Sequence, residues 1–239
     1  MIFRHDIHEG VPLALMDRVN LLYADLPYGT GRKFKHYGDP VEGAVGVAQS
    51  IVTAAAMLLV PGGVVVLQCD HRVNYKVRTL LEDTPYLSFL NEIIWSYASG
   101  GAGQKKVPHK HDTLHVFYKK GGTYTFNVLR EPYPRDYGSR AGFHPDGRMC
   151  TSVWNIPILS TTSKERTGYS TEKPPKLLER VLLTYSNPGD LVYDPCCGSG
   201  VTGVAAQTTG RKYSLSDINP VAVKISRDRL DPSTSSRYS

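Results

Sequence analysis

The chain contains 239 residues, of which 41% are hydrophobic and 21% are charged. This length fits one large α/β domain with a modest insertion and is too short for two full-sized domains. The apolar share excludes a disordered or collagen-like chain. The formal net charge is +6, and nine Lys and Arg residues but only four acidic residues lie between positions 100 and 150.

Neither a membrane span nor a secretory signal is expected. The longest apolar stretch, residues 51–67, is interrupted by Pro61-Gly62-Gly63, which predicts a helix, a turn and a buried strand. The first six residues contain no basic leader followed by an apolar run. We therefore expect the chain to stay in the cytoplasm.

The first two thirds of the chain contain four expected strands and one clear helix. Apolar runs predict strands at residues 21–24, 64–67, 93–97 and 113–118. A helix from about residue 42 to residue 59 separates the first two of these strands.

The clearest local pattern lies in the last third. A helix at 175–185 precedes a turn at 187–190, a strand at 191–193, a Gly-rich loop at 194–200, a helix at 201–209, a strand at 212–215 and a helix at 220–230. Asn219 and Pro220 supply the N-cap and first-turn proline of the last helix, and residues 232–239 are expected to fray. Because two parallel strands cannot form a stable sheet alone, the earlier strands must complete it. The prediction is an α/β fold with a mostly parallel, twisted sheet and helices on both faces.

The basic segment between residues 100 and 150 also carries seven aromatic side chains. Lys and Arg interleaved with aromatic residues bind phosphate backbones and stack on bases. A solvated basic loop with a small aromatic core of its own fits this composition equally well.

Metal and disulfide sites are not expected. The four cysteines (Cys69, Cys150, Cys196 and Cys197) include one adjacent pair and no Cys-x-x-Cys, so we interpret them as reduced thiols. His109, His111 and His115 lack neighbouring cysteines or paired carboxylates at ligand spacing. We expect these histidines to face solvent or DNA.

A loop suited to a nucleotide follows Asp194. Residues 198–203 match G-x-G-x-x-G between a strand and a helix, and Asp217 lies about 20 residues beyond Gly198. The glycines let a nucleotide approach the backbone, and Asp217 can hold ribose hydroxyls. The carboxylate of Asp194 suits a cationic sulfonium or amino group and opposes a pyrophosphate, which disfavours a dinucleotide. A purely structural turn is the alternative.

A second group of chemically suited residues, Asp25-Leu26-Pro27-Tyr28, ends the strand at residues 21–24. An exocyclic amine of adenine or cytosine is a poor nucleophile because its lone pair is delocalised into the ring. The Asp25 carboxylate and the Leu26 carbonyl are placed to accept its two hydrogens and localise that lone pair. Pro27 fixes the direction of the carbonyl, and Tyr28 offers a ring that stacks on a flipped base. Taken alone, such a tetrapeptide is often only a turn.

At these two sites the sequence resembles the amino-directed DNA methyltransferases, in the subgroup whose catalytic tetrapeptide precedes the cofactor loop. Residues 25–28 are similar to that family's Asp-Pro-Pro-Tyr, and residues 194–200 are similar to its Asp-Pro-Phe-Cys-Gly-Ser-Gly. Residues 168–174 resemble the family's Gly-Tyr-Pro-Thr-Gln-Lys-Pro, and residues 5–7 lie where the family has Gly-Asp-Cys. The resemblance covers the chain from near residue 1 to about residue 230.

The resemblance implies a Rossmann-like methyltransferase fold, with S-adenosylmethionine as the cofactor and no metal. It implies that Asp25, Leu26, Pro27 and Tyr28 are the catalytic residues, and we assign no general base. The implied cofactor-binding residues are Asp6, Ile7, Thr171, Lys173, Asp194, Pro195, Cys196, Gly198, Ser199, Gly200, Asp217 and Ile218. Among these, Asp6 would meet the cofactor's adenine, and residues 168–174 would lie beside its methionine part. We expect Lys173, next to a Pro-Pro helix start, to be a solvated or phosphate-facing cation.

In the family, the region between residues 112 and 153 carries target recognition, which coincides with the basic segment. We therefore expect one catalytic domain, formed by residues 1–119 and 150–231, with a target-recognition insertion at 120–149. The expected DNA-binding residues are Lys105, Lys106, Lys110, Arg130, Arg135, Arg140 and Arg148. The expected partner is double-stranded DNA, which would associate the protein with the nucleoid. A homodimer and a cognate restriction endonuclease are open as further partners.

Two departures from the family pattern bear on activity. Leu26 replaces the second proline, but the chemistry needs only its carbonyl; Cys196 replaces a phenylalanine that would lie against the cofactor. The resemblance favours adenine N6 over cytosine N4, because the tetrapeptide begins with Asp instead of Ser. The alternatives are a cytosine N4 enzyme, an RNA or protein-glutamine methyltransferase, a catalytically silent DNA-binding module, and a dehydrogenase.

Overall fold

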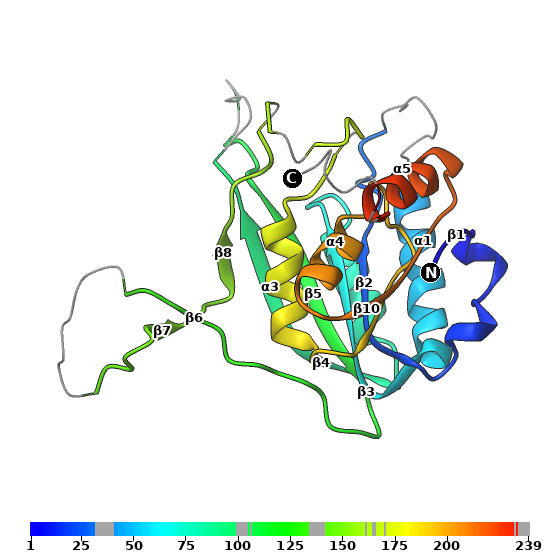
Figure 1. The fold of residues 1–239 in the computed structure, drawn as a ribbon. Coiled ribbons are helices and arrows are strands. Elements are labelled where there is room, and N and C mark those ends of the chain that lie inside the picture. The colour runs from blue at the N-terminus through cyan, green and yellow to red at the C-terminus, as the bar shows by residue number, and fades with distance from the viewer. Residues whose placement is uncertain are drawn as a thin grey trace.

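The computed structural model describes residues 1–31, 41–98, 105, 107–133, 142–160, 162–163, 166–169, 171–231 and 233. Within them, eight strands form one sheet in the order β1-β10-β9-β2-β3-β5-β4-β8 (Figure 1). The strands are β1 (Ile2–Arg4), β2 (Val19–Asp25), β3 (Leu59–Cys69), β4 (Leu87–Ser96), β5 (His111–Lys119), β8 (Val153–Asn155), β9 (Leu191–Asp194) and β10 (Lys212–Asp217). The first five strands in this order are mutually parallel, and β5 runs antiparallel to β3 and β4.

The strands of the last third complete the sheet that the earlier strands begin. β9 and β10 lie between β1 and β2, so segments from the two ends of the chain alternate. In this strand order β9 and β10, the strands on either side of the Gly-rich loop and α4, are part of the larger sheet and do not form a sheet of their own. This confirms the predicted mostly parallel α/β architecture.

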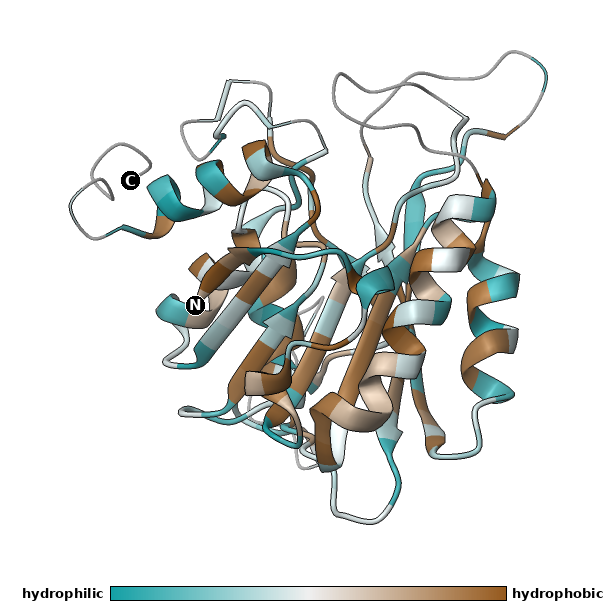
Figure 2. Cartoon of the chain, turned by 90° about the vertical axis from the view of Figure 1, so that its right-hand side faces the viewer, coloured by the Kyte–Doolittle hydropathy of each residue, from teal (hydrophilic) through white to brown (hydrophobic). Residues whose placement is uncertain are grey.

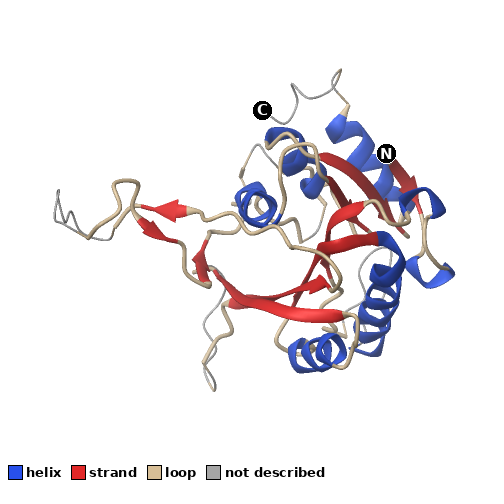
Figure 3. Ribbon diagram, turned by 90° about the horizontal axis from the view of Figure 1, so that it is seen from below, coloured by secondary structure: helices blue, strands red, loops and turns tan. Residues whose placement is uncertain are grey.

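Helices cover both faces of the sheet, as Figure 3 shows from below. The helices are α1 (Val41–Leu58), α2 (Asn74–Glu82), α3 (Pro175–Tyr185), α4 (Val201–Thr208) and α5 (Pro220–Leu230). In β2, Leu22 and Ala24 share a buried cluster with α1 and α2, whereas Leu21 and Tyr23 share one with α3 and α4. Successive strand residues point to opposite faces, so residues 21–24 of β2 form a continuous apolar run because both faces of the strand are covered.

The helix α1 is a core helix of this fold. Among the residues that the structure describes, it alone has the length and apolar composition that could cross a membrane. Its buried residues include Ala48, Ile51 and Leu58, which pack into the cluster shared with the sheet. The apolar residues of α1 and of the strands beside it lie together in Figure 2.

A small hairpin projects from the body of the molecule (Figures 1 and 3). Its strands, β6 (Arg130–Glu131) and β7 (Arg148–Met149), pair antiparallel. Just before it the chain is tied to the end of α3, because the Asn127 side-chain amide donates to the carbonyl oxygens of Leu183 and Ser186 at 3.0 and 2.9 Å. The hairpin lies inside the predicted insertion at 120–149, and those domain boundaries stay a prediction.

Candidate active site

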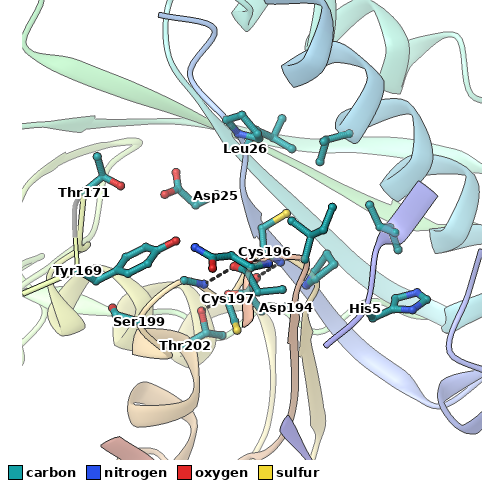
Figure 4. Close-up of a pocket in the computed structure, with 18 of the residues that line it drawn as sticks. His5, Asp25, Leu26, Tyr169, Thr171, Asp194, Cys196, Cys197, Ser199 and Thr202 are labelled. Carbon is teal, nitrogen blue, oxygen red and sulfur yellow. Dashed lines mark hydrogen bonds between the residues drawn. The ribbon is translucent and has the colours of Figure 1, made fainter. Parts of the chain in front are cut away.

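A cavity of about 560 Å³ opens where β2, β9 and β10 end. Ligands of open α/β sheets bind at the carboxyl ends of the strands. In Figure 4 the labelled side chains of Asp25, Tyr169 and Asp194 point toward this cavity. The predicted residues that line it are Asp6, Ile7, Asp25, Leu26, Pro27, Tyr28, Thr171, Lys173, Asp194, Pro195, Cys196, Gly198, Ser199, Asp217 and Ile218.

Asp25 lines this cavity and has one carboxyl oxygen in an ion pair and one without a partner among the described residues. It is the last residue of β2, and its Oδ2 accepts a hydrogen bond from the Lys173 ammonium. Among the described residues, its buried Oδ1 has no hydrogen-bond partner. Burial raises the pKa of Asp25 to about 6, and the charge of Lys173 opposes this rise. A donor bound in the cavity would satisfy an oxygen that is costly to bury alone.

The prediction that Lys173 faces solvent or phosphate is wrong. Its side chain is only 5% exposed, and its ammonium is paired with Asp25. The ammonium also lies 4.8 Å from the centroid of the Tyr28 ring. Lys173 precedes α3 and meets β2 only through the fold, so no local signal in the sequence could reveal this contact.

Tyr28 is half-buried and is held at its hydroxyl. This hydroxyl donates to Asp112 Oδ2 at 2.7 Å. Asp112, on β5, is buried, and the sequence analysis did not assign it to the site. The signal that could have found it is an acidic residue inside an otherwise apolar strand.

Asp194 fixes the shape of the Gly-rich loop. Its Oδ1 accepts from the Cys196 backbone N–H at 2.9 Å, and its Oδ2 accepts from the Thr202 hydroxyl at 2.6 Å. Burial raises the pKa of Asp194 to about 7, although these hydrogen bonds lower it. The carboxyl group therefore braces the loop from inside while lining the cavity.

The two glycines of the loop have different tasks. Gly198 has φ +50°, and its N–H donates to Asp217 Oδ2 at 2.9 Å. Gly200 has φ +78°, and a Cβ there would lie 2.8 Å from Ser226 Oγ on α5. Gly200 is absent from the cavity lining. Gly200 thus lies against α5, and its expected place in the cofactor site stays a prediction.

The far end of the cavity is built from Asp6 and the turn after β10. Asp6 accepts from the His8 N–H at 2.9 Å and so caps the short 3-10 helix Ile7–Glu9. Asp217 Oδ1 accepts from the Asn219 N–H at 2.8 Å. Ile218, beside it, is 54% exposed. An exposed apolar side chain next to two carboxylates suits a planar ring with polar edges.

A buried ion pair joins the segment before α3 to the Gly-rich loop. The Glu172 side chain is fully buried and accepts from Arg229 Nη1 at 3.3 Å. The same Arg229 nitrogen donates to Ser199 Oγ at 3.2 Å. Thr171, next to Glu172, has the unusual φ of +66°. The ion pair thus fixes the backbone next to Lys173. The sequence did not predict this ion pair.

The predicted DNA-binding residues are divided between the hairpin and the segment before β5. Arg148 pairs with Glu131 at 2.7 Å, and Arg130 donates to the Gly147 carbonyl at 2.9 Å. Lys105 is exposed and Lys110 is half-buried. Lys106, Arg135 and Arg140 lie outside the described residues. Their contacts with DNA stay a prediction.

The three histidines that were considered as metal ligands, His109, His111 and His115, divide into two groups. The rings of His109 and His111 stack at 4.0 Å, and His71 extends the stack at 3.8 Å. His115 is fully buried, its Nε2 lies 2.5 Å from Asn74 Oδ1, and burial lowers its pKa to about 4. The expectation that His115 faces solvent or DNA is therefore wrong. Over the described part of the chain, no group of three His, Cys, Asp or Glu residues is arranged to hold a metal.

A family model described as DNA methylase, of the N6/N4 type, matches residues 19–228. The chain belongs to this family. The Escherichia coli (strain K12) protein named DNA adenine methyltransferase YhdJ is 28% identical over 247 residues, covering 93% of this chain and 79% of the relative. The Type II methyltransferase M.HpaI of Haemophilus parainfluenzae is 26% identical over 215 residues, covering 89% of this chain and 68% of the relative.

Solved structures share the fold. The M1.HpyAVI–SAM complex superposes with a TM-score of 0.66 at 21% identity, covering 90% of this DNA methylase and 89% of that chain. The PvuII DNA methyltransferase, described as cytosine-N4-specific, gives a TM-score of 0.68 at 17% identity, with 93% and 85% of the two chains covered. The predicted methyltransferase fold is thereby confirmed.

Proposed function

We propose that this DNA methylase uses S-adenosylmethionine to methylate the exocyclic amine of a base flipped from double-stranded DNA, and that the base is adenine. The observation that carries the proposal is Asp25, a residue of the cavity wall whose buried Oδ1 lacks a hydrogen-bond partner among the described residues. A primary amine has the N–H donors that such an oxygen needs.

The residues around the cavity fit the proposed cofactor. S-adenosylmethionine supplies a methyl group on a cationic sulfonium. The carboxyl group of Asp194 would favour that charge in a low-dielectric site. Asp217 and the exposed Ile218 would hold the nucleoside end, and the backbone of Gly198 allows close approach. The volume of about 560 Å³ lies within the range of ligand sites.

Asp25 and Leu26 act on the amine in this proposal. Asp25 Oδ1 and the Leu26 carbonyl accept its two hydrogens, which localises the lone pair on nitrogen and aims it at the methyl group. When the N–C bond forms and the bond between the methyl group and the sulfonium breaks, a neutral thioether would leave and positive charge would pass to the nitrogen, where the Asp25 carboxylate would stabilise it. The methylated amine is acidic and releases one proton, which water can take. Tyr28 contributes its ring face to hold the base.

Adenine is favoured over cytosine by two considerations. The tetrapeptide begins with Asp25, which resembles the adenine-directed form of the motif. A relative that aligns with 93% of this chain is named a DNA adenine methyltransferase. Relatives named Type II methyltransferases also favour a role in restriction and modification.

The substrate side of the proposal rests on the projecting hairpin. Arg130 and Arg148 lie on it, and Lys105 and Lys110 lie in the segment before β5. Basic residues in these positions would track a phosphate backbone on either side of a flipped base. The substrate we propose is double-stranded DNA, which the protein would bind in the cytoplasm at the nucleoid. A homodimer or a cognate endonuclease would extend this account, and the site requires neither.

The test is to identify the methylated nucleoside. Purified protein is incubated with unmethylated DNA and isotopically labelled S-adenosylmethionine, and the digested nucleosides are separated by mass spectrometry. We expect label in N6-methyladenine. Label in N4-methylcytosine would keep the mechanism and overturn the base assignment. Label only in an RNA or protein offered in parallel would overturn the DNA substrate, and cofactor binding without any transfer would favour a silent DNA-binding module.

A further inference from the structure

A buried network of polar side chains lies behind Tyr28. The carboxyl group of Asp112 is 1% exposed and accepts at Oδ2 from Tyr28 Oη (2.7 Å) and from Gln68 Nε2 (2.9 Å). Its Oδ1 accepts from the Tyr97 hydroxyl at 3.2 Å. Gln68 Oε1 in turn accepts from the Tyr23 hydroxyl at 2.8 Å. Residues of β2, β3 and β5 are thereby joined to the loop that carries Tyr28.

The donors and acceptors of this network match in only one arrangement. Gln68 donates with its nitrogen to Asp112 and accepts with its oxygen from Tyr23. The reversed amide would aim its oxygen at a carboxyl oxygen that already accepts from Tyr28. A fully satisfied buried network specifies a single geometry.

Gln68 also holds the backbone of the tetrapeptide at residues 25–28. Gln68 is opposite Asp25 in the β2–β3 register. Its carbonyl oxygen accepts from the Leu26 N–H at 2.9 Å. The backbone of Gln68 therefore fixes Leu26, and its side chain, through Asp112, fixes Tyr28. The two residues on either side of Pro27 are held from one point of β3.

The hydroxyl of Tyr28 is consequently used in a hydrogen bond within the protein. Its hydroxyl donates to Asp112, and the ring stays half-buried within 4.8 Å of the Lys173 ammonium. We propose that Asp112 is a positioning residue for methyl transfer: it fixes the Tyr28 ring at the orientation in which a flipped base stacks on it with the amine at Asp25. This inference rests on the proposed function, because it needs a base in the cavity.

Loss of this anchor would act on the reaction and not on the cofactor. Without Asp112 as acceptor, the Tyr28 ring is free to turn about its side-chain bonds, and the base that stacks on it moves with it. A displacement of about 1 Å costs about 100-fold in rate. Asp112 is absent from the cavity lining, so cofactor affinity should not change.

A double-mutant cycle between the two residues tests the proposal. We compare kcat, the KM for DNA and the Kd for S-adenosylmethionine in the wild type, Tyr28→Phe, Asp112→Leu and the double variant; leucine has a similar shape and no acceptor. Each single variant should lower kcat by about 10- to 100-fold while the cofactor Kd stays within about 2-fold. The double variant should be no more than about 3-fold slower than the slower single variant, because both remove one interaction. Tyr185→Phe is the control, since it removes a comparable hydroxyl bond, to Asn91, away from the cavity.

Two results would overturn the role of Asp112 in an active enzyme. One is Asp112→Leu with wild-type kcat; the other is a double variant whose loss equals the product of the single losses. If Asp112→Leu does not fold, Tyr28→Phe decides, because the proposal requires its kcat to fall although the ring is kept. A wild type without any transfer would overturn the proposed function and this inference with it.

Discussion

Lys173 and Asp25, 148 residues apart in the chain, form a buried ion pair in the wall of the cavity. One carboxyl oxygen is bound to the ammonium, and the other is buried without a partner among the described residues. The pair links the start of α3 to the end of β2. Folding therefore places the Asp25 carboxyl group in the cavity wall and also brings it the Lys173 charge that favours its ionised form. A buried carboxylate without such a partner would be protonated.

The ion pair predicts the pH dependence of activity. Because burial raises the pKa of Asp25 to about 6, the carboxylate forms, and activity rises, as the pH passes upward through that value. Lys173 lowers this pKa, so Lys173→Met should move the acidic limb of kcat/KM to higher pH and reduce activity at pH 7. Lys173→Arg should keep the limb near its original place. The limb reports the free enzyme.

Lys224→Met is the matched control for that experiment, because it breaks an exposed ion pair with Asp228 on α5. Its acidic limb should coincide with that of the wild type. An unshifted limb in Lys173→Met would contradict the role assigned to the lysine.

The buried pair between Glu172 and Arg229 predicts a loss of stability. Glu172→Gln removes the carboxylate charge that faces the Arg229 side chain, which is 4% exposed, and should lower the free energy of unfolding by about 3 kcal/mol. Glu82→Gln, which breaks the exposed pair with Arg78, should cost less than about 1 kcal/mol. Urea unfolding of both variants checks the difference. Equal losses of unfolding free energy in the two variants would show that the buried pair does not stabilise the fold more than an exposed pair does.

The backbone of the Gly-rich loop predicts a steric effect at Gly200. Gly200→Ala combines φ +78° with a Cβ that would lie 2.9 Å from Ser226 Cβ, and should cost about 1–3 kcal/mol and weaken cofactor binding. Gly189→Ala has a similar φ of +88° but nothing within 4 Å, so it should cost only about 1 kcal/mol. Thermal unfolding and cofactor titration separate the two. Identical behaviour would contradict the proposed contact with α5.

Sequence reasoning located most of the fold because its signals are local. The helix α3 and the N-cap of α5 by Asn219 are where apolar spacing and proline placed them. The helix α2 was missed because only Val77 and Leu81 of its residues are buried, which leaves a weak apolar stripe. The three-residue β1 was missed because a short edge strand has little pattern of its own.

The site was predicted where motifs are contiguous and missed where contacts are long-range. The tetrapeptide and the Gly-rich loop each occupy one stretch of sequence, and both line the cavity. The partners of Lys173 and Tyr28 come from other strands. Only the assembled sheet brings Asp25 and Asp112 to the same end of the fold.

The hairpin predicts a salt-dependent contribution to DNA binding. Arg130→Gln and Arg148→Gln should each lower the slope of log K against log salt by about 1, because each phosphate contact releases a counterion. Arg227→Gln is the control; this arginine also donates to a backbone carbonyl, that of Ile2, but lies on α5. Filter binding at several salt concentrations measures the slopes. An unchanged slope in both hairpin variants would remove the hairpin from the DNA interface.

The central claim is that Asp25 accepts the amine of the target base and is not needed to hold the cofactor. The most direct measurement compares single-turnover methyl transfer and the Kd for S-adenosylmethionine in the wild type, Asp25→Asn and Asp25→Ala. The account predicts that Asp25→Ala loses transfer by about 1000-fold or more, that Asp25→Asn loses nearly as much, and that both bind the cofactor with little change. An equal loss of transfer and cofactor binding, or transfer that survives in Asp25→Ala, would contradict it.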